Sequence, residues 1–486
     1  MNKELQPSVK VRRIETSAEL KNVLESGLND LYQRVFAAPP YNEKFTTDEV
    51  IDIFLSYFES GGIIFVAKDD TDKPVAFVTA VPLKSEFNVA ALVSKNIDIN
   101  CSSYFAEDGV AENLRKNGIS ARMKAILLSA CQQEGYESLI LRTSVYNYKQ
   151  ISAVNKAGGV VIAGLFQNVS GPRADGTMTQ DTRSFYKFDL DANTASNKTV
   201  LERVTIVRPG GNDTAIVWDD IPREEQGTLS KRIQSTYPGI EQVMFVERGQ
   251  NGLVRGQMAG GEFCGNATRS LGYLVREGRD GQAFLEISGA SQPMSVVVES
   301  GMAQTSLPVK EDLNSAQPSG DDYIVHLDGI SFIITAKDSV LGATILSQQD
   351  TEQQKAMALN ALREKGLSDR YPASGVMIID RQSENSFKVE PFVYVRDTGT
   401  LYYETGCGSG STSIGIMVAK ESGSSVKNLK ITQPSGMDLL VSINRDEEKF
   451  ESATVNGPIE ILFDGRMHIA SPEVALTTAA PQAAIA

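Results

Sequence analysis

Short apolar runs and helix-period patterns alternate along the first third of the chain. Two apolar runs, Ile63–Ala67 and Pro74–Pro82, flank the polar turn Lys68–Lys73 and predict a pair of strands. From Ile119 to Gln133 apolar residues recur at positions 119, 123, 126, 127, 130 and 131, the spacing of one helix face. The pattern predicts a mixed sheet with helices, and Cys131 on the apolar face is expected to be a buried core thiol.

Two polar segments divide the chain. The segment Asp189–Lys198 is small, polar and poor in apolar residues, and it lies between the expected strands Ser184–Phe188 and Val204–Val207. A second polar segment, Glu311–Asp322, splits the remainder into two parts of similar size. The predicted divisions are a first domain at 1–190, a linker at 191–200, two halves of a second domain at 201–322 and 323–466, and a poorly ordered tail at 467–486.

Composition excludes several classes of protein. The net charge of −14 with no basic run argues against binding nucleic acid. Four cysteines make neither a disulfide framework nor a zinc cluster, and two histidines leave little material for a metal site, so no metal is expected. The longest apolar stretch, Gly158–Phe166, is far shorter than the roughly 20 residues that span a bilayer. Because the N-terminal residues have no apolar leader pattern, we expect a cytoplasmic protein without a membrane partner.

A candidate phosphate site lies in the sequence YFAEDGVAENLRKNGIS, Tyr104–Ser120. An expected strand ends near Val110, and Arg115, Gly118 and Ser120 precede or open the predicted helix. Free backbone N–H groups at a helix N-terminus attract anions, glycine lets a phosphate approach, and arginine adds charge. An arginine and a glycine placed near a helix start by chance would give the same sequence pattern without a phosphate site.

Residues 10–190 resemble the GNAT acetyltransferase family. The segment above is similar to its fourth strand and acetyl-coenzyme A pyrophosphate loop, and Glu107 matches the acid that often serves as general base. The resemblance implies binding of acetyl-coenzyme A by Val110, Arg115, Gly118, Ser120 and Asn147. The tyrosine that many members use as general acid is replaced by Val154, so a GNAT fold retained for acceptor binding or dimerisation is the alternative.

Two segments in the later part of the chain share a sequence motif. Cys264–Val275 and Cys407–Val418 both have cysteine followed by glycine, serine at +6, glycine at +8 and valine at +11. This agreement at unchanged spacing predicts an internal duplication in which each half places a cysteine at the start of a helix. The helix dipole is expected to lower the pKa of such a thiol, and the following Gly-Asn and Gly-Ser pairs offer N–H groups to a carboxylate.

Two thiols that face each other across a pseudo-dyad suit the inversion of an amino acid at Cα. One thiolate removes the α-proton while the opposite thiol returns a proton, and the roles are exchanged in the reverse direction. Donors on the substrate carboxylate stabilise the developing carbanion. Such an enzyme needs no pyridoxal phosphate, and no cofactor is expected for this part of the chain.

From about Val204 to Asp464 the chain resembles the diaminopimelate epimerase family of cofactor-independent amino-acid racemases. The resemblance lies in GGND at 210–213, IEQV at 240–243, GEFCGN at 261–266 and ETGCGSG at 404–410. It implies a duplicated α/β (α+β) domain with two pseudo-symmetric halves, and it makes Cys264 and Cys407 the acid/base pair. It also implies a set of substrate-binding residues: Asn212, Gln242, Gly265, Asn266, Glu404, Gly408 and Ser409.

Departures from the family bear on the substrate. The family's N-A-D-G-S is replaced by the shorter Met258–Gly261, the arginine expected in the stretch 397–404 is missing, and a further family asparagine falls near Ser374. Without these partners, the distal charges of diaminopimelate would be buried at a high cost. The motifs FCGNAT and GCGSGS are more similar to those of the histidine racemase of metallophore synthesis than to those of cell-wall enzymes.

Alternatives to a racemase remain open at this stage. An amino-acid sensor could regulate the acetyltransferase-like domain, and a proline-racemase-like enzyme would also use two cysteines, although it normally carries a histidine where Asn266 stands. Buried structural cysteines or a redox disulfide would also survive a duplication. The expected partner is a small molecule, a free amino acid, and a homodimer is left open.

Overall fold

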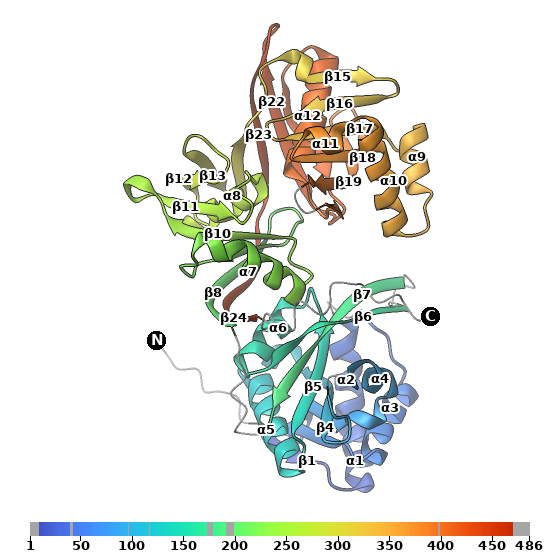
Figure 1. Ribbon diagram of the computed structural model, residues 1–486. Coiled ribbons are helices and arrows are strands. Elements are labelled where there is room, and N and C mark those ends of the chain that lie inside the picture. The colour runs from blue at the N-terminus through green and yellow to red at the C-terminus, as the bar shows by residue number, and fades with distance from the viewer. Residues whose placement is uncertain are drawn as a thin grey trace. The chain divides into compact units, whose positions relative to one another are not determined.

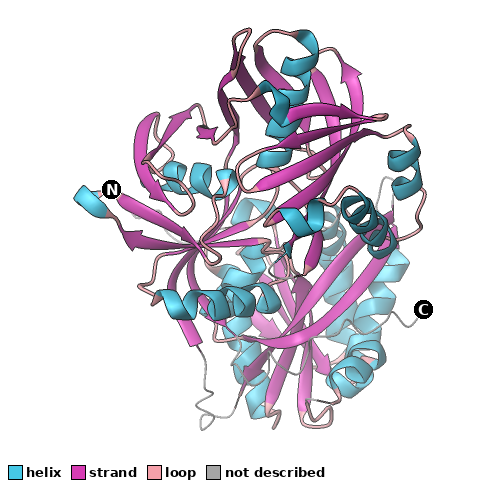
Figure 2. Cartoon of the chain, turned by 45° about the horizontal axis from the view of Figure 1, so that its top comes forward, coloured by secondary structure: helices cyan, strands magenta, loops and turns pink. Residues whose placement is uncertain are grey.

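The computed structural model describes residues 9–38, 42–95, 97–115, 117–172, 178–190, 199–396 and 399–469. The chain forms two compact units (Figures 1 and 2). The first comprises Met1–Val200 with the short segments Ser235–Pro238 and Arg466–Ala486, and the second comprises Leu201–Gln234 and Gly239–Gly465. Most of the expected linker at 191–200 lies outside the described residues. Within the described ranges, no helix is long and apolar enough to cross a membrane.

The first unit contains a mixed seven-stranded sheet with the order β1-β2-β3-β4-β5-β7-β6. The predicted strand pair is confirmed as antiparallel β2 and β3, and the predicted helix is confirmed as α5 (Ile119–Gln133), with Cys131 fully buried. The strands are β1 (Lys10–Arg13), β2 (Ile63–Lys68), β3 (Pro74–Pro82), β4 (Ser102–Val110), β5 (Ser138–Ser144), β6 (Val160–Pro172) and β7 (Met178–Asp189). The other α-helices are α1 (Ser17–Val23), α2 (Asn29–Ala37), α3 (Thr47–Glu59), α4 (Phe87–Val93) and α6 (Tyr148–Lys156).

Among the described strands of this sheet, only β4 and β5 pair in parallel, and their pairing is short. Ser102–Tyr104 pair with Ser138–Ile140, although β4 continues to Val110 and β5 to Ser144. On its other side β4 pairs with β3 along its length, with a register shift that leaves Ala106 without a partner. The residues of β4 after Tyr104 and of β5 after Ile140 therefore lie where the two strands are no longer hydrogen-bonded to each other.

The second unit repeats one succession of elements. Its first half contains β8 (Thr199–Arg208), β9 (Thr214–Val217), α7 (Arg223–Thr236), β10 (Gln242–Arg248), β11 (Val254–Met258), α8 (Gly265–Val275), β12 (Gly281–Ile287), β13 (Met294–Glu299) and β14 (Met302–Leu307). The second half contains β15 (Ala316–Ser319), β16 (Asp322–His326), β17 (Ile330–Ala336), α9 (Val340–Leu346), α10 (Thr351–Glu364), α11 (Leu367–Arg370), β18 (Ala373–Ser383), β19 (Ser386–Val395), β20 (Thr400–Tyr403), α12 (Gly408–Ser422), β21 (Val426–Thr432), β22 (Asp438–Arg445), β23 (Phe450–Pro458) and β24 (Glu460–Ile469).

The strand pairings of the two halves follow the same order. Antiparallel β8–β9, parallel β9–β10, antiparallel β10–β11, parallel β11–β12 and antiparallel β12–β13–β14 correspond to β16–β17, β17–β18, β18–β19, β19–β21 and β21–β22–β23. Strands β14 and β23 pair antiparallel and join the halves. The predicted duplication is confirmed. The predicted division at 322/323 falls at the start of β16, inside the β15–β16 hairpin, and β24 runs three residues into the predicted tail.

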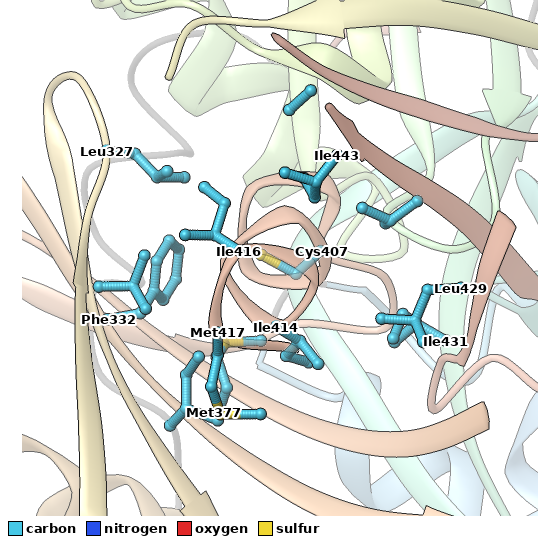
Figure 3. Close-up of a cluster of buried hydrophobic side chains, with 14 of the residues drawn as sticks. Leu327, Phe332, Met377, Cys407, Ile414, Ile416, Met417, Leu429, Ile431 and Ile443 are labelled. Atoms are coloured by element: carbon cyan, nitrogen blue, oxygen red, sulfur yellow. The ribbon is translucent and has the colours of Figure 1, made fainter. Parts of the chain in front are cut away.

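Each half wraps its sheet around one central helix, and the shared glycine at +8 shows why. A Cβ on Gly272 of α8 would lie 2.4 Å from Val296 of β13, and one on Gly415 of α12 would lie 2.6 Å from Val441 of β22. Both helices therefore pack directly on the sheet at the same point. Figure 3 shows α12 end-on inside its apolar core, with Cys407 among the buried side chains.

Candidate active site

The two cysteines of the repeated motif occupy the same position in their helices. Cys264 is the N-cap of α8 and accepts a hydrogen bond from Ala267 N at 3.4 Å, while Cys407 is the N-cap of α12 and accepts one from Gly410 N at 3.3 Å. The prediction that each cysteine begins a helix is confirmed. Both thiols are free, Cys264 is partly exposed, and Cys407 is only 5% exposed. No disulfide bond joins Cys264 and Cys407, although the redox-pair alternative would require one.

The two helix starts lie against each other. Asn266, in the first turn of α8, donates to the Gly406 carbonyl at 3.2 Å. A Cβ on Gly408, in the first turn of α12, would lie 3.2 Å from Asn266 Oδ1. The negative charge of a Cys264 thiolate also raises the pKa of Cys407, as expected of two neighbouring sulfur atoms. The structure thus brings together both cysteine motifs.

The GGND loop reaches the second cysteine motif. The Asn212 backbone N–H donates to Thr405 Oγ1 at 2.8 Å, and its side-chain oxygen accepts from Gly406 N at 3.3 Å. Gly211 has a φ of 122°, and a Cβ there would lie 2.2 Å from the Thr405 carbonyl oxygen. Asp213 is fixed in turn by two Arg208 hydrogen bonds of 2.7 Å. The loop is therefore held rigidly beside Cys407.

The two sulfur atoms have different polar neighbours. Cys264 Sγ donates to the amide oxygen of Gln242 at 3.2 Å, and Thr214 donates to the same oxygen at 3.3 Å. Cys407 instead hydrogen-bonds to the carboxyl group of Glu404, which also bonds to Asn212. One thiol therefore faces a neutral amide and the other an acid.

A second carboxyl group, Glu241, was not among the residues singled out from the sequence. Thr405 Oγ1 donates to it at 2.6 Å, and burial raises the pKa of both Glu241 and Glu404 to about 7. The charge on Glu404 adds to the rise for Glu241. Its position next to Gln242 in IEQV was the available signal.

Two further buried residues hold the site and were also missed. Gln433 accepts from Cys407 N at 2.8 Å and donates to Ser411 Oγ at 3.0 Å. Arg269, fully buried on α8, donates to the Pro209 carbonyl at 2.8 Å at the start of the GGND loop. Burial lowers the pKa of Arg269 to about 10. Position +5 of the second motif holds Thr412, so this support is specific to the first half.

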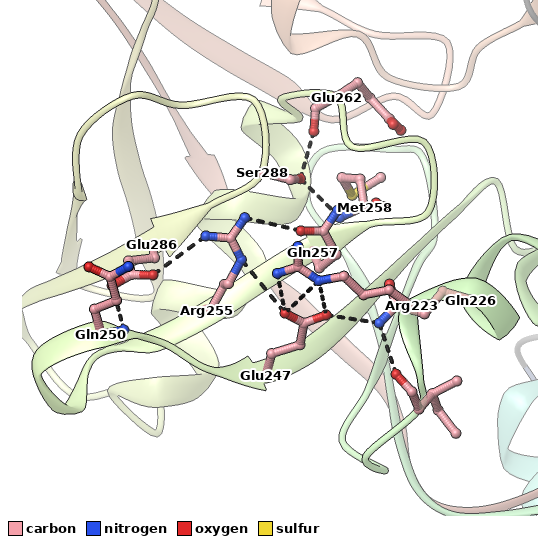
Figure 4. Close-up of polar contacts among 11 residues, drawn as sticks. Arg223, Gln226, Glu247, Gln250, Arg255, Gln257, Met258, Glu262, Glu286 and Ser288 are labelled. Carbon is pink, nitrogen blue, oxygen red and sulfur yellow. Dashed lines mark hydrogen bonds and ion pairs between the residues drawn. The ribbon is translucent and has the colours of Figure 1, made fainter.

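The segment before Cys264 is anchored by a polar network (Figure 4). The Ser288 hydroxyl accepts from Met258 N at 3.0 Å and donates to the Glu262 carbonyl at 2.8 Å. Arg255 contacts Gln257 at 3.2 Å on the same strand and lies 3.7 Å from Glu247. These bonds fix the direction in which the chain enters α8.

The predicted lowering of the thiol pKa is wrong. Burial is the largest effect at both sulfur atoms: it raises the pKa of Cys264 to about 12, with Glu262 and Glu404 adding to the rise, and the pKa of Cys407 well above its usual value. Backbone N–H groups at the helix starts act in the expected direction, but they are outweighed because a thiolate loses its hydration. In the free protein both groups are therefore thiols at neutral pH.

We expect alkylation to report this protonation state. At pH 8 a thiol with a pKa of about 12 is only about one part in ten thousand thiolate, so Cys264 should react with iodoacetamide far more slowly than free cysteine. Its rate should climb through pH 10 without a plateau, and buried Cys407 should react more slowly still. Peptide mass spectrometry measures both, and a plateau below pH 8 would contradict the raised pKa.

In the first unit the structure places the candidate residues at three points. Glu107 lies on β4, where its carboxylate accepts from Tyr32 at 2.9 Å, and burial raises its pKa to about 8. Gly118 is the left-handed N-cap of α5, and Asn147 is the N-cap of α6. Two bonds order the loop between β4 and α5: Arg115 Nε donates to the Val110 carbonyl at 3.3 Å, and Ser120 donates to Asp108 at 3.1 Å. Val154 is buried in the core.

Known proteins are similar to each part of the chain. Residues 204–468 match the model of the family described as histidine racemase CntK N-terminal domain. A histidine racemase of Staphylococcus aureus is 26% identical over 290 residues, which cover 56% of this chain and 99% of the relative. A histidine racemase of Fusobacterium nucleatum is 28% identical over 281 residues, covering 54% of this chain and 95% of the relative.

Solved structures are similar to the two parts at low identity. An N-acetyltransferase from Staphylococcus aureus matches 38% of this chain and 99% of its own length, with 18% identity and a TM-score of 0.30. A phenazine biosynthesis PhzF-family protein from Enterococcus faecalis matches 55% of this chain and 98% of its own length, with 12% identity and a TM-score of 0.37. The family match covers more than half of the chain. The chain belongs to this histidine racemase family, and it is an amino-acid racemase or epimerase.

Proposed function

We propose that the second unit racemises histidine at Cα, with Cys264 and Cys407 as the acid/base pair and without a cofactor. The observation that carries the proposal is the meeting of two helix-start thiols, linked through Asn266 and Gly406. The histidine racemases among its relatives support the choice of substrate.

The reaction starts from the state in which one cysteine has given its proton to solvent, and it leaves the number of protons on the protein unchanged. One cysteine, as thiolate, takes the α-proton, so that the Cα–H bond breaks and an S–H bond forms. The other cysteine gives its proton to the opposite face of Cα, so that the enantiomer leaves with the sulfur protonation states exchanged. The α-proton is very weakly acidic, and a thiolate whose pKa is raised by burial is a stronger base for it.

The helix starts are suited to the substrate carboxylate. Gly265 and Asn266 begin α8, and Gly408 and Ser409 begin α12, and the first backbone N–H groups of a helix have no carbonyl partner within it. These donors stabilise the negative charge that spreads from Cα onto the carboxylate in the transition state.

The acids of the site support a substrate with a basic side chain. Glu241 and Glu404 each have a pKa raised to about 7, close to the ordinary value for imidazole of about 6.5. A proton can therefore be shared between a carboxyl group and the imidazole at little cost. Placing the imidazole or the substrate ammonium here would also relieve the repulsion between the two acids.

Deuterium exchange tests this function. The dialysed protein is incubated in deuterium oxide with each of the twenty L-amino acids, and mass spectrometry with chiral separation follows Cα. Histidine is expected to gain deuterium and to approach an equal mixture of enantiomers. Exchange with other amino acids but not histidine would overturn the substrate, exchange with proline would favour the proline-racemase-like alternative, and exchange with none would favour the sensor.

We further propose that the first unit binds acetyl-coenzyme A at the start of α5. The residues here fit a phosphate: Gly118 has a φ of 75° with no atom within 4 Å of its would-be Cβ, Arg115 lies on the loop before it, and Ser120 lies in the first turn of α5. When bound, this co-substrate supplies an acetyl thioester. Glu107, with its pKa of about 8, would accept the proton of an acceptor amine, and Val110 and Asn147 complete the proposed contacts.

A further inference from the structure

Two charged groups lie on the diverging ends of β4 and β5. Glu107 is on β4, and Arg142 is on β5, each beyond the last residue that pairs the two strands. Because the strands no longer close on each other there, a bound molecule can contact both. Neither group contributes to the racemase site, which belongs to the second unit.

Both groups have a buried atom without a partner among the described residues. Glu107 Oε1 accepts from Tyr32, and Tyr57 also interacts with this carboxyl group, whereas Oε2 makes no hydrogen bond within 3.5 Å. Arg142 Nη1 donates to Gln167 at 2.5 Å, and Tyr104 also interacts with this guanidinium, whereas Nε makes no hydrogen bond within 3.5 Å. Buried polar atoms in native proteins are almost always paired. An unpaired acceptor and an unpaired donor on two splayed strands point to a ligand that carries the complementary groups.

The surroundings carry both signs of charge. Burial raises the pKa of Glu43 and Glu86, while Arg183 and Arg142, respectively, lower it. Tyr104, at the last paired position of β4, interacts with Arg142 and with Glu86. Acids thus lie toward β4 and its neighbouring helices, and guanidinium groups lie on β5 and β7.

We propose that the first unit acetylates the α-amino group of a free α-amino acid, with Arg142 binding its carboxylate and Glu107 facing its amine. The inference rests on the proposed acetyl transfer and names its acceptor. The neutral amine nitrogen forms a bond to the acetyl carbon, the thioester C–S bond breaks, and the amine proton passes to Glu107. Coenzyme A leaves as a thiolate, which takes a proton from solvent. Arg142 is a binding residue and takes no part in the bond changes.

Other acceptors fit the charges less well. A simple amine or polyamine would leave the Nε of Arg142 without a hydrogen bond and would bring a cation next to the guanidinium. A peptide N-terminus has no carboxylate beside its amine, so it too would leave Arg142 Nε without a hydrogen bond. A zwitterionic amino acid satisfies both groups at once, and the product of the racemase unit belongs to that class.

The test uses the full-length chain with Cys264→Ser and Cys407→Ser, so that racemisation does not change the substrate. L-histidine, D-histidine and histamine, which lacks the carboxylate, are the acceptors, with acetyl-coenzyme A as donor. Mass spectrometry of the N-acetyl product gives kcat and KM. We expect kcat/KM for one histidine enantiomer to exceed that for histamine at least about a hundredfold.

Adding Arg142→Gln should raise the KM for histidine at least about tenfold and leave the KM for histamine within about twofold. Arg34→Gln, which changes an exposed arginine on α2, is the matched control and should alter neither. Calorimetry gives a readout apart from turnover: with coenzyme A present, Arg142→Gln should remove one histidine site per chain.

The outcomes separate the two proposals. Equal use of histidine and histamine, or an Arg142→Gln variant with unchanged KM and stoichiometry, would overturn the amino-acid acceptor while leaving acetyl transfer standing. Failure of every acceptor to release coenzyme A would overturn the acetyltransferase itself. A hundredfold preference that Arg142→Gln abolishes would establish the carboxylate contact.

Discussion

We expect Cys407→Ser and Cys264→Ser each to lower kcat for histidine racemisation at least about a thousandfold, because each removes one of the two proton-transfer groups. Each single variant keeps the opposite sulfur. It should therefore retain slow exchange of the α-proton of one enantiomer with deuterium oxide while failing to convert it to the other. Chiral chromatography and mass spectrometry of the same sample separate these two events.

Cys101→Ser provides the control for this pair. Cys101 is a free cysteine of the first unit, and its substitution should leave racemisation unchanged. If either Cys264→Ser or Cys407→Ser still racemised histidine at more than about a tenth of the normal rate, the two-thiol mechanism would be wrong. Symmetric exchange of both enantiomers by one single variant would contradict it equally.

The second large effect concerns a backbone contact rather than a reacting group. A Cβ on Gly211 would lie 2.2 Å from the carbonyl oxygen of Thr405 and 2.7 Å from Gly406 Cα, and its φ of 122° disfavours any other residue. Gly211→Ala must therefore push the GGND loop away from the second cysteine motif. We expect it to lower the free energy of unfolding of the second unit by about 2–4 kcal/mol and to abolish racemisation.

Gly227→Ala is the matched substitution. Gly227 lies inside α7, and nothing lies within 4 Å of its would-be Cβ, so alanine should raise the free energy of unfolding by up to about 1 kcal/mol. Chemical denaturation and the deuterium assay on both variants make the comparison. A Gly211→Ala protein with normal stability and activity would show that the loop contact is not needed.

The duplication could be read from the sequence because its signals are local. A cysteine that caps a helix, and a glycine two turns later where the helix meets the sheet, must keep their spacing within one helix. Gly272 and Gly415 pack against equivalent strands, so the same packing requirement calls for a glycine in both halves. Pattern reasoning is strong for features of this kind.

The remaining site residues could not be found in this way because they arrive from distant segments. Gln433 reaches Cys407 from the end of β21, and Arg269 supports Pro209, sixty positions before it in the sequence. The sign of the thiol pKa shift was also out of reach, because it depends on how much protein surrounds each sulfur. A local motif gives the helix dipole but does not give the extent of burial.

The unequal neighbours of the two sulfur atoms have a thermodynamic consequence. Cys264 faces the amide of Gln242, whereas Cys407 faces the acid Glu404. Mirror-image amino acids in solution have identical free energies, so their equilibrium constant is one and the two directions must share a single kcat/KM. The chemical difference between the halves can therefore change kcat and KM only in proportion. The enantiomer with the lower KM must also have the lower kcat for conversion to its mirror image.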